Sequence, residues 1–404
     1  MKLPLSAQQD ATAEYPLPLE NFGRAHLAEL FEDRVIFRSL EPVDRRLPGL
    51  KRVRYRLGLP DLVIPRKLDE DYARVALWIL EQAQDRRGAT VDELLWIGDT
   101  LSGDGAAFQN LRRLSGRPGS AFVGNEQASE PPRGALDPET HIYQANRWAA
   151  LADWLAKLLE MGLRLDRHTV VLVDLDKTAL GARGRNHRAI DRARLEALHT
   201  VVASVLGDAF DRTVFEEHYN RLNQPQYHHI TQDNQDYLAY IALVMSTPAI
   251  DCQDLMERID AGALRSFDQF VRWVGTCVVG NARISEVMRQ IHETVTNAVQ
   301  IGDPTPFKRF RRAEFEATLR RMGHLPDDTP ASARLQEEIT LTQEVREAVL
   351  WLVRRDVLVV GLSDKPDEAS LPHPVHHRGL PPIHRAETHS VGVSLAEALA
   401  RLDR

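Results

Sequence analysis

Short apolar runs that stop at polar residues are the clearest pattern along this chain. Three of them have the length of a buried strand and end at a turn-forming or polar residue. They are Leu94–Ile97 before Gly98 and Asp99, Val170–Val173 before Asp174, and Val357–Leu362 before Ser363. Shorter runs at 34–38 and 120–123 also indicate strands.

Helical segments separate these runs. The expected helices are 24–30, 69–84, 104–114, 141–161, 341–354 and 394–402, with Gly162 at the C-cap of the fourth. Helices that alternate with buried strands predict an α/β fold with a mostly parallel, Rossmann-like sheet. Proline-bearing stretches at 125–139 and 371–392 predict loops.

Residues 185–340 differ from the rest, because they predict helices with few strand signals. We expect a large, separate α-helical domain here, joined to the sheet domain through linkers near 180–186 and 335–342. The expected division is an N-terminal arm, the first part of the core, the helical domain, and the second part of the core with a tail. These parts span 1–23, 24–184, 185–340 and 341–404.

Composition then narrows the functional classes. The chain has 404 residues, of which 43% are hydrophobic and 27% charged, as in ordinary globular proteins. A net charge of −7 disfavours a general nucleic-acid binder. Two cysteines, Cys252 and Cys277, are too few for a disulfide framework or a cysteine-based zinc site, and we expect both to be buried. Without an apolar signal-peptide core or a membrane-length apolar stretch, we expect a cytoplasmic protein with no membrane partner.

Polar residues that follow the buried strands form the candidate site. The carboxyl ends of parallel strands meet at one edge of a sheet, where ligands bind. We therefore expect the carboxylates of Asp99, Asp104, Asp174 and Asp176 to converge. Convergence requires the strand before Asp174 to lie between the strands that end near Asp99 and at Ser363, and parallel to both.

Such a set of residues can transfer a phosphoryl group. A carboxylate at a strand end can attack phosphorus, and a second one two residues later can protonate the leaving oxygen and then activate water. Hard oxygen ligands without nearby His or Cys favour Mg²⁺. A lysine and a hydroxyl, here Lys67 and Ser363, can bind the phosphate oxygens.

These segments resemble the motifs of the haloacid dehalogenase superfamily. The run Val170–Thr178, VVLVDLDKT, is similar to its first motif, hhhhDxDxT. Val359–Ser363 resembles the second motif, Lys67 the lysine of the third, and the run GDTLSGD at 98–104 the fourth. The resemblance implies a phosphatase or phosphotransferase, because the dehalogenases of the superfamily lack the second aspartate, here Asp176.

The resemblance also implies a role for each catalytic residue. Asp174 would be the nucleophile and Asp176 the general acid and base. Thr178 would orient Asp176 or its loop, and Ser363 and Lys67 would bind the phosphoryl group.

The implied metal is Mg²⁺. Its ligands would be Asp174, the backbone carbonyl of Asp176, and Asp99, with Asp104 in support. Lys365 stays an alternative to Lys67 as the phosphate-binding lysine.

The motifs occur in the order third, fourth, first, second, which implies a circularly permuted core. The helical stretch between the first and second motifs stands where this superfamily carries a C1-type cap, which closes over the site and excludes water. A small phosphorylated substrate is the expected partner. Two alternatives stay open: a catalytically silent binding or regulatory module, and a phosphatase acting on nucleic-acid ends, which the cap and the net charge disfavour.

Three further features have two interpretations each. The basic run 307–312 favours a solvated helix face with two anchoring phenylalanines over a patch for a second anionic group of the substrate. The polar stretches 223–229 and 233–236 favour the lining of a substrate pocket over ordinary loops. Histidines of the tail favour a plain loop over a metal site; they are His373, His376, His377, His384 and His389.

Overall fold

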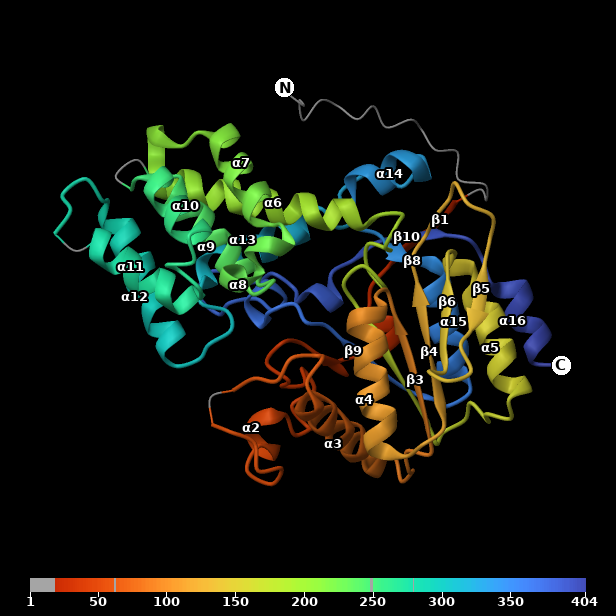
Figure 1. The fold of residues 1–404 in the computed structure, drawn as a ribbon. Coiled ribbons are helices and arrows are strands. Elements are labelled where there is room, and N and C mark those ends of the chain that lie inside the picture. The colour runs from red at the N-terminus through yellow and green to blue at the C-terminus, as the bar shows by residue number, and fades with distance from the viewer. Residues whose placement is uncertain (1–18, 62, 248–249, 279) are drawn as a thin grey trace.

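The computed structural model describes residues 19–404 except 62, 248–249 and 279. Its centre is a seven-stranded sheet in the order β2-β9-β7-β3-β4-β6-β5 (Figure 1). Every neighbouring pair is parallel except β5 and β6. The strands are β2 (Val35–Ile36), β3 (Glu93–Gly98), β4 (Gly119–Gly124), β5 (Gly134–Leu136), β6 (Ile142–Ala145), β7 (Thr169–Asp174) and β9 (Leu358–Leu362). The expected α/β fold with a mostly parallel sheet is confirmed.

The central strand β7 has the two neighbours that a convergent site requires. Val173 pairs in parallel register with Gly361 of β9 on one side and with Ile97 of β3 on the other. The carboxyl ends of these three strands therefore lie side by side at one edge of the sheet.

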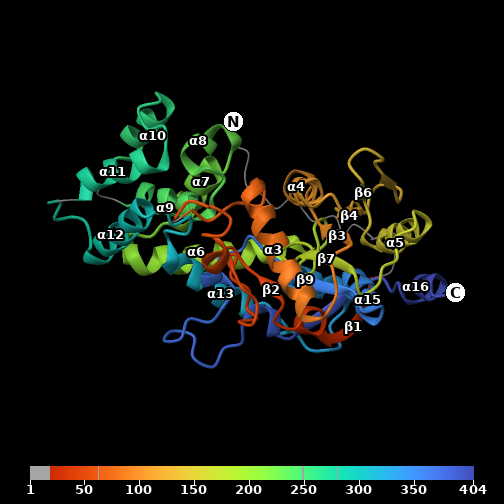
Figure 2. The ribbon, with the colours of Figure 1, turned by 90° about the horizontal axis from the view of Figure 1, so that it is seen from below.

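Helices cover both faces of this sheet, because successive strand side chains point to opposite sides. Leu95 and Ile97 of β3 belong to the same buried cluster as α1, α5 and α15, whereas Leu94 and Trp96 belong to that of α3 and α4. Figure 2 shows α3 and α4 on one side of the sheet and α5 and α15 on the other. The covering helices are α1 (Ala28–Phe31), α3 (Glu70–Arg86), α4 (Ala106–Ser115), α5 (Leu151–Glu160), α15 (Gln343–Arg354) and α16 (Ala396–Leu402). A four-residue helix, α2 (Leu50–Val53), precedes α3.

A second, three-stranded sheet corrects three expectations. Its strand β1 (Glu20–Ala25) pairs antiparallel with β10 (Thr388–Gly392), and β10 pairs in parallel with β8 (Leu341–Thr342). Positions 20–23 of the expected arm and 24–25 of the expected first helix are thus strand, as is the end of the predicted loop 371–392. Strands β1 and β10 lie more than 360 residues apart, so no local pattern predicts their pairing. Residues 1–18 of the expected arm lie outside the described residues.

The expected helix 141–161 is wrong in its first half. Residues Ile142–Ala145 form β6, and β5 pairs with it from within the predicted loop 125–139. The apolar spacing of the segment fits a helix, but four residues are too few to distinguish a helix from a short strand. Its second half is α5, and Gly162 follows the helix with φ +86°, as expected of a C-cap glycine.

Between β7 and β8 the described residues contain helices and no strand. They are α6 (His187–Leu206), α7 (Arg212–Leu222), α8 (His228–Thr231), α9 (Gln235–Met245), α10 (Cys252–Asp260), α11 (Phe267–Val278), α12 (Glu286–Gln300), α13 (Lys308–Arg320) and α14 (Ala331–Glu337). We call residues 185–340 the helical insert; helices α6–α13 gather beyond one end of the main sheet (Figure 1). No helix in the described part of the chain combines the length and apolarity needed to cross a membrane.

The chain enters and leaves the helical insert at one place. The N–H of Gly181 donates to the carbonyl of Thr340 at 2.9 Å, and the N–H of Thr342 donates to the carbonyl of Ala179 at 2.9 Å. The two linkers therefore run side by side, next to the end of β7.

The helical insert is packed onto the sheet domain rather than suspended from its linkers. Its apolar residues belong to the same buried cluster as one face of the sheet. Glu314 of α13, fully buried, lies 3.1 Å from Arg194 of α6, 2.7 Å from Arg311 and 3.8 Å from Lys365, which follows β9. Lys308 of α13 pairs with Glu368 at 2.5 Å.

Replacing Glu314 with glutamine should destabilise the protein strongly. The change leaves three buried cations around a neutral side chain, which typically costs about 3–5 kcal/mol. Glu316→Gln on the same helix removes a half-exposed carboxylate and should cost about 1 kcal/mol or less. Urea unfolding of both variants measures the difference, and equal losses would show that Glu314 does not tie the insert to the core.

Candidate active site

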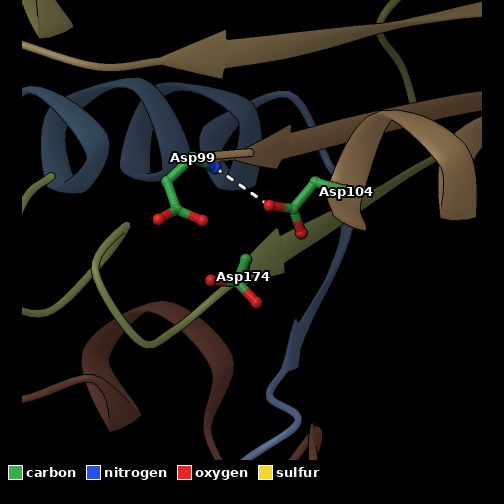
Figure 3. A group of neighbouring side chains, drawn as sticks. All are labelled: Asp99, Asp104 and Asp174. Carbon is green, nitrogen blue, oxygen red and sulfur yellow. Dashed lines mark hydrogen bonds between the residues drawn. The ribbon is translucent and has the colours of Figure 1, made fainter. Parts of the chain in front are cut away.

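Three buried carboxylates meet at the ends of β3 and β7. Asp174 is the last residue of β7, Asp99 follows β3 directly, and Asp104 lies in the π-helical turn Leu101–Gly105. One oxygen of each carboxylate lies within 4.8 Å of the others (Figure 3). We call these residues the acidic triad. Asp99, Asp104 and Asp174 thus lie together, as expected from the strand order.

The turn after β3 is built to receive the Asp104 carboxylate. One of its oxygens accepts the backbone N–H groups of Asp99 at 3.0 Å and Thr100 at 3.1 Å, and the other accepts the indole N–H of Trp96 at 3.2 Å. A side chain at Gly98 would collide with this carboxylate. The motif GDTLSGD therefore needs its first glycine for close approach.

Lys67 neutralises part of the acidic triad. Its ammonium lies 2.7 Å from Asp104 and 2.5 Å from Asp174, and only 8% of the side chain is exposed. Lys365 instead contacts Thr318 of the helical insert at 3.3 Å. Of the two lysines considered from the sequence, Lys67 is the one that contacts the triad.

The three carboxylates differ in their affinity for protons. Burial raises the pKa of Asp99 to about 7, and the charge of Asp104 adds to this rise while Arg183 opposes it. Burial also raises the pKa of Asp174 well above its usual value, against the pull of Lys67. Burial acts on Asp104 too, but Lys67 and backbone N–H donors outweigh it and lower that pKa to about 2. Asp104 is thus the member of the triad that stays ionised at neutral pH.

Asp176 lies outside the triad, on the wall of the cavity that opens over it. Its carboxylate is 30% exposed and lies 3.9 Å from Arg194. Lys177, the next residue, has φ +64°, in the left-handed region that non-glycine residues rarely adopt. The turn after β7 therefore bends sharply and presents Asp176 to the cavity.

Two expected site residues, Thr178 and Ser363, do not line the main cavity. The buried hydroxyl of Thr178 has no hydrogen-bond partner among the described residues, so it does not orient Asp176 through a hydrogen bond, and its alternative role in orienting the loop stays a prediction. The hydroxyl of Ser363 accepts the N–H of Lys365 at 3.0 Å, and Ser363 lines a small pocket beside the main cavity. The chain reaches the main cavity one residue later, at Asp364.

Two arginines of the site escaped the sequence analysis. Arg183 forms a close ion pair with Asp99, and Arg194 lies opposite Asp176. The linker that carries Arg183 is fixed by Arg185, which is buried between Glu126 at 2.9 Å and Glu344 at 2.8 Å. Arg183 belongs to the basic run GARGRNHR at 181–188, but the spacing of this run matches no motif.

A cavity of about 540 Å³ opens over the triad and is lined from both parts of the fold. The core supplies the triad, Lys67 and the segment after β9. The helical insert supplies residues 233–236, Pro304, Thr305 and the two arginines Arg194 and Arg311. The insert therefore forms one wall of the candidate site.

The basic run of α13 is a solvated face only in part. Phe307 and Phe310 are buried anchors, as expected. Arg311, in contrast, is buried, lines the cavity and pairs with Asp236 at 2.6 Å. Residues 233–236 also line the cavity, as expected for a pocket, whereas 223–229 do not.

The tail histidines and the cysteines have ordinary structural places. His384 pairs with Asp33 and His389 with Glu338, each at 2.9 Å. Neither belongs to a candidate metal site, because the acidic triad is the one candidate metal-ligand group within the described residues.

Cys252 and Cys277 are free and partly exposed, so the expectation that they are buried is wrong. Both lie on α10 and α11 of the helical insert, where solvent reaches one helix face.

The chemistry of the triad fits a bound cation. Three carboxylates with two neighbouring cations, Lys67 and Arg183, leave one negative charge in excess when all are ionised. Burial makes this excess costly, as the raised pKa values of Asp99 and Asp174 show. A hard divalent cation with oxygen ligands would remove the cost.

Protein-family models, curated proteins and solved structures all lack a match to this chain. The resemblance to the haloacid dehalogenase superfamily therefore depends on the four sequence motifs alone. The geometry of the acidic triad is independent of that resemblance.

Cation binding should depend on pH through Asp99. Its pKa rises from 3.8 to about 7 on folding, so the folded protein holds a proton that the unfolded chain has lost. Stability without metal should therefore fall as pH rises between these values. A cation displaces this proton, so calorimetric titration with MgCl₂ should give about tenfold weaker binding at pH 6 than at pH 8.

Two variants check the origin of this dependence. Asp99→Asn removes one of the two triad carboxylates whose pKa burial raises, and it should bind Mg²⁺ weakly, with a flatter pH profile. Asp233→Asn removes an exposed carboxylate from the same cavity and should keep the wild-type profile. Equal affinity at both pH values in the wild type would contradict the assignment.

Proposed function

We propose that this protein is a Mg²⁺-dependent phosphohydrolase of the haloacid dehalogenase type, with a circularly permuted core and a capping helical insert. Its substrate is a small phosphorylated metabolite. The observation that carries the proposal is the placement of Asp174 at a central strand end, 2.5 Å from Lys67 and within reach of Asp99. The proposal is also supported by the four motifs, whose residues lie at one sheet edge.

In this reaction Asp174 attacks the phosphorus and forms an aspartyl phosphate. Asp176 donates a proton to the leaving oxygen, then takes a proton from the water that hydrolyses the intermediate. Lys67 places its charge beside Asp174 and so binds a phosphate oxygen as charge moves in the transition state. Asp104 holds Lys67 in place.

The carboxylates of Asp99 and Asp174 would hold Mg²⁺, with Asp104 beside them. When bound, the cation supplies the positive charge that keeps Asp174 ionised and lets an anionic phosphate approach. Arg183 pairs with Asp99 and limits the charge that the cation must balance. Ser363, which lines the small neighbouring pocket, would act through the backbone of Lys365.

Asp174→Asn should abolish turnover of a generic aryl phosphate with Mg²⁺, by about a thousandfold or more, because an amide cannot attack phosphorus. The fold should persist, because Lys67 keeps its ion pair with Asp104 at 2.7 Å and the amide removes one of three mutually repelling carboxylates. Release of aryl alcohol gives the rate, and circular dichroism checks the fold. Asp233→Asn is the matched control.

Full activity of Asp174→Asn would refute the mechanism. A wild-type protein that binds Mg²⁺ but hydrolyses no phosphomonoester would favour the silent binding module instead. The two outcomes differ, since only the first leaves a working enzyme.

Small substrates should be hydrolysed faster than macromolecular ones. The helical insert forms a wall of the cavity and packs on the core, so a folded phosphoprotein or a duplex end has little room to reach Asp174. Values of kcat/KM for a small phosphomonoester, a phosphopeptide and a 5′-phosphorylated oligonucleotide measure this preference. Faster hydrolysis of the oligonucleotide would support the alternative of a nucleic-acid phosphatase.

A further inference from the structure

Most cations that line the cavity already have a close carboxylate partner. Lys67 and Arg183 contact the acidic triad. Lys177 pairs with Asp191 at 2.9 Å, and Arg194 and Arg311 pair with Glu314 at 3.1 Å and 2.7 Å. These five side chains are therefore neutralised within the protein, and a sixth, Lys365, lies 3.8 Å from Glu314.

Two arginines of the cavity wall differ from these. Arg66 has no carboxylate partner among the described residues, and its one side-chain hydrogen bond goes to the carbonyl of Gln232 at 3.4 Å. The nearest carboxylate to Arg38 is Asp364, at 3.7 Å, and its guanidinium has no side-chain hydrogen bond in the described part of the chain. Only 13% of the Arg38 side chain is exposed, and none of its guanidinium nitrogens is sealed from solvent, so its unused donors are open to the cavity that Arg38 lines.

The two arginines lie at a common place between the core and the helical insert. Arg38 follows β2, and Arg66 precedes Lys67. Both charges act on the hydroxyl of Tyr237 in α9, where they oppose the rise that burial gives to its pKa. Tyr237 is fixed by stacking on Phe267, with 3.7 Å between the ring centroids.

We propose that Arg38 and Arg66 form a binding site for a second anionic group of the substrate, a carboxylate or a second phosphate. This inference rests on the proposed phosphohydrolase function and names its substrate class: small phosphomonoesters with an anionic tail. A planar guanidinium binds either group through two parallel hydrogen bonds. Because Arg66 is the sequence neighbour of Lys67, the tail site adjoins the site for the phosphoryl group.

The placement also gives selectivity against neutral tails. A hydroxyl tail offers the Arg38 guanidinium one neutral acceptor oxygen, whereas an anionic tail balances its charge and accepts two parallel hydrogen bonds. A site built to pair a charged group can discriminate by tenfold or more against the analogue that lacks it.

The test compares alkyl phosphomonoesters that end in a hydroxyl, a carboxylate or a second phosphate, with chains of two to six carbons. We expect kcat/KM for the best anionic tail to exceed that for the hydroxyl tail by about tenfold or more. The carboxylate and phosphate arms identify which group is preferred, and the best chain length reports the span between the two sites.

Arg66→Gln and Arg38→Gln should each lower this ratio of kcat/KM by about tenfold. Arg66→Lys should lower it less, because the charge remains while the two-pronged hydrogen bonding is lost. Arg52→Gln removes an exposed cation of α2 outside the cavity and should keep the ratio, which controls for long-range charge effects. Arg66 is exposed, so its variant should fold even if that of Arg38 does not.

A wild-type ratio near one, or a ratio unchanged in both variants, would overturn the proposal while leaving the phosphohydrolase function intact. An equal fall for every tail would overturn it too, since it would place the arginines at the phosphoryl group. If no ester is hydrolysed, calorimetric binding of methylphosphonate against carboxyalkyl phosphonates to the Mg²⁺-loaded protein gives the same ratio without turnover. Preference for the carboxyalkyl compounds that depends on Arg66 would then support the site although the hydrolytic function had failed.

Discussion

Charge repulsion among three buried carboxylates is the constraint on which this structure depends. Their proximity follows from the parallel register of β3 and β7, which brings two strand ends to one point. Lys67 offsets part of the repulsion through Asp104 and Asp174, and breaking such a buried pair typically costs about 3–5 kcal/mol. The remaining excess of negative charge is what suits the cluster to a divalent cation.

The helical insert also carries charges that balance buried carboxylates, on the other side of the cavity. Arg183 at its entrance pairs with Asp99, and Glu314 gathers Arg194, Arg311 and Lys365 around one carboxylate. Since Lys365 follows β9, this cluster joins the insert to the strand beside β7. Movement of the insert over the cavity would therefore break the Glu314–Lys365 and Lys308–Glu368 ion pairs as well as apolar contacts, so the insert is closer to a fixed wall than to a freely swinging lid.

Local patterns predicted the central part of the fold and all three residues of the triad. Apolar runs of strand length predicted β3, β7 and β9, and the aspartates after them followed from the common edge of parallel strands. What escaped prediction depends on distant partners: β1 pairs with β10 across the length of the chain, and β6 is a strand only because β4 and β5 flank it. Arg183 and Arg194 were missed for a related reason, because an arginine gains a role in a site only when folding brings a carboxylate to it.

The position of β9 in the sheet has a consequence for synthesis on the ribosome. This strand lies between β2, near the start of the chain, and β7, in its middle. Until residue 362 has left the ribosome, β2 has no place in the main sheet and β7 presents an open edge to solvent. The edge of β7 stays exposed while the whole helical insert is synthesised, which favours aggregation or capture by chaperones. The strand that completes the main sheet thus also leads into Lys365 at the cavity, so a chain that ends before β9 cannot carry a formed site.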